Sequence, residues 1–111
     1  MPATQAKAKP KYPSFTAKVK EGIKADPRWE NLKNVMYATW QTIGSDCISC
    51  CEEQNEKMNN AAAIETVLDA NYMSFNEGKA GKEAEAYVEE LDKTYGYKAI
   101  EKFLNAEVRL Y

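Results

Sequence analysis

The amino-acid sequence predicts an all-α protein, a compact bundle of four to five antiparallel helices that follows a flexible basic N-terminal arm. Apolar side chains recur at intervals of three and four in successive segments, which is the spacing of one helix face. Glycine or proline separates these segments, and none alternates apolar and polar residues as a half-buried strand does. At 111 residues the chain has the size of one domain, so we expect residues 1–13 to form the arm and residues 14–111 a single helical domain.

The arm, MPATQAKAKPKYP, combines Ala, Lys and Pro without a periodic apolar pattern. Pro10 and Pro13 have no backbone N–H and favour an extended backbone. A segment with so little apolar surface does not offset the entropy lost on ordering, so we expect it to stay mobile unless a partner binds it.

Two helices are expected next. The first covers 15–25, with Ser14 as its N-cap. The second begins at Asp26-Pro27, because Asp caps a helix well and Pro suits the first helical position. Its apolar stripe consists of Trp29, Leu32, Met36, Trp40 and Ile43. Gly44 leaves open whether 27–57 is one helix or two, since an interior glycine costs only about 1 kcal/mol relative to alanine.

Three further stripes follow a turn expected at Asn59-Asn60. The first ends near Gly78, a candidate C-terminal cap, and contains Ile64, Val67, Leu68, Tyr72 and Phe75. The second covers 82–95 and the third 97–111, with Gly96 between them.

Charge is divided by position along the chain. Residues 1–28 carry seven basic and two acidic side chains, a net charge of +5, whereas residues 29–111 carry eight and fifteen, a net charge of −7. This polarity indicates contact with a charged partner or with an assembly, although it does not identify the partner.

Lys7, Lys9, Lys11 and Tyr12 are the candidate residues for contact with nucleic acid or an acidic partner. The lysines can neutralise phosphates and the tyrosine can stack on a base. The alternative is that the arm only keeps the protein in solution.

Cys47, Cys50 and Cys51 form the one conspicuous local motif, because helical spacing places all three on one face. A structural zinc site takes four Cys or His ligands, whereas this chain has three Cys and no His. We therefore expect the thiols to act as small hydrophobic residues, with a metal or redox site as the weaker interpretation.

Enzymatic activity and a bound cofactor are not expected. The chain lacks histidine, the usual general base, and it has no glycine-rich phosphate loop. No apolar run approaches the roughly 18 residues of a membrane span, and the N-terminus lacks the apolar core of a signal peptide. We expect a cytoplasmic or otherwise intracellular location, which includes an infected host cell or a virion.

The leading functional hypothesis is a non-enzymatic protein–protein interaction module, an adaptor, assembly component or inhibitor that docks through a helical face. Its candidate interface residues are Trp29, Tyr37, Trp40, Glu52, Glu53 and Tyr87, and self-association is expected as well because tyrosine is enriched at interfaces. The first alternative is a nucleic-acid-binding accessory protein that acts through the arm, and the second is a thiol or metal sensor. An Ala/Lys/Pro arm on a small helical body is similar in style to phage and viral accessory proteins.

Overall fold

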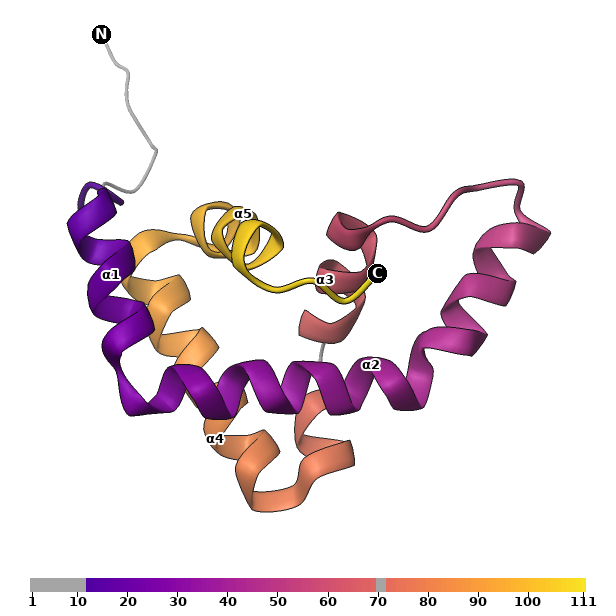
Figure 1. The fold of residues 1–111 in the computed structure, drawn as a ribbon, viewed down its shortest axis with the longest axis horizontal. Helices are drawn as coiled ribbons and strands as arrows, with labels where there is room; N and C mark the ends of the chain where they lie inside the picture. The colour runs from indigo at the N-terminus through magenta and orange to yellow at the C-terminus, as the bar shows by residue number, and fades with distance from the viewer. Residues whose placement is uncertain (1–11, 70–71) are drawn as a thin grey trace, which may run out of the picture.

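The computed structural model describes residues 12–69 and 72–111, which form five helices and no strand (Figure 1). The helices are α1 (Ala17–Ala25), α2 (Pro27–Glu53), α3 (Asn60–Leu68), α4 (Tyr72–Tyr95) and α5 (Tyr97–Glu107). The all-α prediction is confirmed. A regular antiparallel bundle is not confirmed, because α1, α3 and α4 run across the direction of α2 in Figure 1 and not alongside it.

The core lies between α2 and α4, the pair of helices with the most extensive contact, and α3 and α5 close it. The apolar stripe predicted on α2 points into this core, with Leu32 and Met36 fully buried and Ile43 partly buried. Its partners on the other helices include Ile64, Val67, Met73, Ile100 and Leu104.

The segment before α1 is joined to the far end of the chain by aromatic packing. The ring of Phe15 lies 5.1 Å from that of Tyr95 and 5.4 Å from that of Phe103, both in edge-on geometry. The N-cap of α1 is Thr16, whose hydroxyl accepts the Val19 N–H at 3.2 Å. The prediction of Ser14 as the cap was therefore wrong by two residues.

Helix α2 begins as predicted, with the Asp26 carboxylate accepting the Arg28 N–H at 2.9 Å. It continues without a break to Glu53, so the predicted alternative of one long helix is the one observed. Gly44 is accommodated because the Trp40 indole covers it: a Cβ there would lie 2.9 Å from Trp40 Cε2. The space left by the missing side chain is thus filled by the tryptophan one turn earlier.

The stripe predicted from Ile64 to Phe75 does not form one helix. Helix α3 ends at Leu68, where Asp69 is extended, and α4 begins at Tyr72. Helix α4 is itself broken at Gly78, whose φ of 57° and ψ of −123° favour glycine. Gly81 then lets the two parts of α4 cross closely, because a Cβ at this position would overlap the Met73 carbonyl group.

Candidate functional site

A groove of about 290 Å³ separates the C-terminal turns of α2 from α3. In Figure 1 these last turns of α2 bend away from the line of the helix before the chain returns to α3. One wall carries the three cysteines, and the rest is formed by residues from the connection and from α3. The lining consists of Cys47, Cys50, Cys51, Gln54, Met58, Ala62, Glu65 and Thr66.

The thiols of this groove differ in exposure. Cys47 and Cys51 are partly buried, whereas Cys50 is exposed and its sulfur accepts a hydrogen bond from Gln54 Nε2 at 3.2 Å. Burial raises the pKa of the Cys47 thiol, and Cys51, Asp46 and Cys50 act in the same direction. Cys47 is therefore protonated at neutral pH and is not an activated nucleophile.

The sulfurs of the three cysteines are spread along the wall of the groove and do not converge on one position where an ion could sit. In the part of the chain that the structure describes, no group of three or more His, Cys, Asp or Glu side chains is placed to hold a metal ion. Together with the Met58 thioether, the thiols give the groove a soft, polarizable wall that accommodates apolar partners of different shapes.

The last turn of α2 is acidic on the faces of the helix that do not line the groove. Glu52 and Glu53 are exposed in the last turn, which contains no basic residue, and neither forms an ion pair with any described residue. Carboxylates at this end of a helix face the negative pole of its dipole and cost about 0.3 to 1 kcal/mol each. The end of α2 therefore has an uncompensated negative charge, and the groove lies on the face of the same turns that carries the cysteines.

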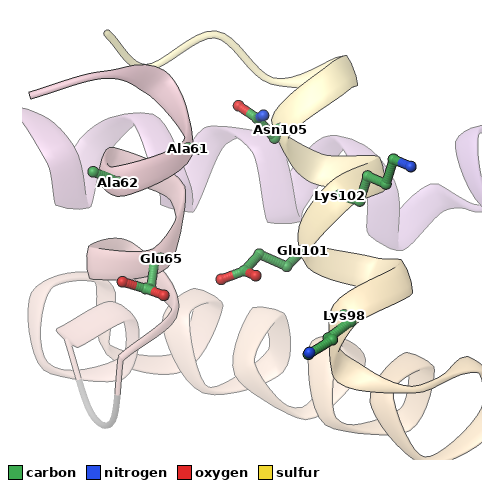
Figure 2. A pocket seen from close by; sticks show the side chains of 7 residues that line it. All are labelled: Ala61, Ala62, Glu65, Lys98, Glu101, Lys102 and Asn105. Carbon is green, nitrogen blue, oxygen red and sulfur yellow. The ribbon is translucent and has the colours of Figure 1, made fainter.

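A second groove, of about 370 Å³, lies on the opposite side of α3, between α3 and α5. It shares Ala62 and Glu65 with the first groove, so α3 forms a ridge between the two. Figure 2 shows the carboxylates of Glu65 and Glu101 pointing toward each other across this gap, with Lys98 and Lys102 flanking them on α5. Its lining mixes both charges, unlike the acidic last turn of α2.

The structure divides the six predicted interface residues into two sets. Trp29, Trp40 and Tyr87 are buried in the core, with 5%, 9% and 3% exposure, so they are not part of the surface. The prediction that they form an interface is corrected, because the helix face that carries them is covered by the other helices. Tyr37, Glu52 and Glu53 are exposed.

Tyr87 has a structural role in this core. Its ring lies under the Arg28 guanidinium at 4.2 Å, and its hydroxyl is 3.5 Å from the Ile23 carbonyl oxygen. Burial raises the pKa of Tyr87 to about 12.

Lys7, Lys9 and Lys11 of the predicted arm lie outside the described residues. Tyr12 is described and is 47% exposed, yet its ring lies against Gly96, where a Cβ would approach ring atoms to 3.0 Å. One face of this ring is thus covered by the turn between α4 and α5.

Sequence reasoning missed two features of the surface. Met58, Ala62 and Thr66 lie beyond the end of α2, and only the return of α3 beside α2 brings them into one groove with the cysteines. Phe75 was assigned to a buried stripe but is 86% exposed, the highest value among the described large hydrophobic side chains.

The chain matches no protein-family model, no curated protein and no solved structure at a significant level, so its function is inferred from its own geometry. No helix among the described residues is both long and apolar enough to cross a membrane.

Proposed function

We propose that this protein is a non-enzymatic interaction module that docks a basic segment of a protein partner onto the end of α2. The observation that carries the proposal is the pair of exposed carboxylates, Glu52 and Glu53, in a last helical turn without a basic residue. Another face of the same helical turns lines an open groove with a sulfur-rich wall. Local rules broken at a surface in this way are typical of functional sites.

A basic partner gains at this site from two sources. Its cation interacts with both the carboxylates and the negative pole of the α2 dipole, which relieves the repulsion present in the free protein. Its apolar side chains displace water from the groove formed by Cys47, Cys51, Met58 and Ala62. The site therefore selects a segment that carries both a lysine or arginine and an apolar side chain.

The test compares two charge-reversed proteins that have the same net charge. The docking variant is Glu52→Lys/Glu53→Lys, and the control is Glu83→Lys/Glu89→Lys on the exposed side of α4. Partners captured from the native host by the tagged protein are identified by mass spectrometry, and their affinities are then measured for each variant. We expect loss of binding in the docking variant alone. A partner that binds the docking variant as tightly as the unmodified protein contradicts the proposal, and equal losses in both variants reduce the effect to overall charge.

A further inference from the structure

We propose that the groove between α3 and α5 is a binding site for a small zwitterion, of which an α-amino acid is the simplest kind. The ammonium group of the ligand lies between the carboxylates of Glu65 and Glu101, and its carboxylate lies beside the ammonium group of Lys98. This groove is on the other side of α3 from the sulfur-lined groove, so the inference does not depend on the proposed function.

The two carboxylates form the acidic half of the site. They come from different helices and point toward each other across the groove (Figure 2), yet neither forms an ion pair with a described residue. Glu101 Oε2 is shielded from solvent, and no described group donates a hydrogen bond to it. A shielded carboxylate oxygen without a donor, facing a second carboxylate, favours a cation between the two.

Tyr97 senses the same negative charge. Burial raises the pKa of its hydroxyl, and the charges of Glu101 and Glu65 raise it further, so both carboxylates act on one region of the groove. An ammonium group suits this region better than a metal ion. Among the residues that the structure describes, no group of three or more His, Cys, Asp or Glu side chains is placed to hold a metal.

Lys98 forms the basic half of the site. Helical spacing places Lys98 beside Glu101 on one face of α5. In Figure 2 the Lys98 ammonium turns toward the gap, whereas that of Lys102 turns away from α3. Lys98 forms no ion pair with a described residue, and it lies in the first turn of α5, where the positive pole of the helix dipole adds to its charge. The groove therefore has a cation site and an anion site next to each other.

This combination of charges selects the class of ligand. A lone cation is attracted by the carboxylates but repelled by Lys98, and a lone anion meets the reverse. A zwitterion satisfies both halves at once. The volume of about 370 Å³ is in the range of small-molecule sites, and the short side chains of Ala61 and Ala62 on the α3 wall leave room for a ligand side chain.

The spacing of the two walls is set by the packing beneath them. Ile64 of α3 and Ile100 and Leu104 of α5 are buried in the core. At one end of the groove, Asn60 Nδ2 donates to Asn105 Oδ1 at 2.7 Å and ties the two helices together. The helices are thus held apart at a set distance before a ligand arrives, which reduces the entropy lost on binding.

The test is a titration of ¹⁵N-labelled protein with glycine, L-alanine and L-leucine, followed through the amide chemical shifts. Methylammonium chloride and sodium acetate, at the same ionic strength, are the probes with a single charge. For ligands this small we expect dissociation constants in the millimolar range and shifts concentrated in residues 61–65 and 98–105. The zwitterions should bind at least about tenfold more tightly than either single-charge probe.

Two variants locate the site. Glu101→Gln and Lys98→Gln each remove one charge and should weaken the binding of L-alanine about tenfold. The matched controls Glu83→Gln and Lys79→Gln remove the same charges at exposed positions of α4 outside the lining, and they should bind L-alanine as the unmodified protein does. The amide spectra also show whether each variant keeps its fold.

Four outcomes overturn the inference. The zwitterions bind no more tightly than methylammonium or acetate, the shifts lie outside the groove, the two groove variants keep full affinity, or the controls lose as much affinity as the groove variants. The comparison of probes uses the unmodified protein, so it decides the question even if a variant does not fold.

Discussion

Replacement of Asn60 by alanine is expected to detach the segment that follows α5 from the core. Asn60 is 6% exposed at the start of α3. Its Nδ2 donates to the Val108 carbonyl oxygen at 2.9 Å and to the side chain and backbone oxygens of Asn105 at 2.7 and 3.1 Å. Its Oδ1 accepts the N–H groups of Leu110 at 2.6 Å and Tyr111 at 3.1 Å.

The expected loss of stability follows from the groups that Asn60→Ala leaves without a partner. The hydrogen bond to the Val108 carbonyl is buried, and an unsatisfied buried acceptor costs about 1 to 3 kcal/mol. The bonds from Leu110 and Tyr111 are partly buried, and each contributes about 0.5 to 1.5 kcal/mol when water replaces the lost partner. The free energy of unfolding should fall by about 2 to 6 kcal/mol.

Urea denaturation followed by circular dichroism measures this change, with Asn59→Ala as the matched control. Asn59 is the exposed N-cap of α3, and its loss should cost about 0.5 to 2 kcal/mol. Asn60→Asp keeps the acceptor for the two N–H groups but places an oxygen against the Val108 carbonyl, so at neutral pH it should be at least as destabilising as Asn60→Ala. A loss below 0.5 kcal/mol for Asn60→Ala, or a harmless Asn60→Asp, would refute this account of the hydrogen bonds.

Three further outcomes are expected. Trp40→Ala should lower the free energy of unfolding by about 3 to 5 kcal/mol because it empties the space over Gly44, and a loss below about 1 kcal/mol in urea denaturation contradicts this packing. The pKa of Tyr87, raised to about 12, is above its unfolded value near 10, so the stabilising contribution of this group is complete below pH 10 and is lost as the pH rises toward 12. Tyr87→Phe should therefore remove part of the alkaline loss of stability seen in denaturation at several pH values, and an unchanged profile excludes this origin. If the basic arm binds nucleic acid, removal of residues 1–11 should flatten the slope of log affinity against log salt by about 2 to 3 units, and an unchanged slope leaves the arm as a solubilising tail.

Most helix positions follow from local chemistry and were predictable. The Asp26-Pro27 start of α2 depends on neighbouring residues alone, as does the break between α4 and α5 at Gly96, which has a positive φ. Gly78 and Gly96 were assigned as helix ends from residue type alone, because glycine adopts a positive φ at little cost. The position of the α1 cap was missed because Ser14 and Thr16 are both suitable by type. Thr16 is the cap in the structure, and Phe15 before it packs on Tyr95 and Phe103, which are distant in sequence.

The candidate site was only half predictable. The three cysteines lie on one helix face by their spacing, so this wall of the groove was predictable. Met58, Ala62 and Glu65 join them through a turn and a second helix, and no local pattern carries that information. In the same way, Asn60 has the sequence character of a turn residue, and its buried hydrogen bonds to residues 105–111 exist only because α5 packs beside α3.

What the sequence by itself determined is the all-α class, the apolar stripe of α2 and the separation of a basic start from an acidic body, because periodicity and charge are properties of neighbouring residues. Which apolar side chains remain exposed was decided by the tertiary structure. Trp40 and Phe75 both belong to stripes of helical spacing, yet one is 9% exposed and the other 86%. Burial depends on whether another helix covers a given helix face. The chain reverses at Gly78, and the helix face that carries Phe75 is left uncovered.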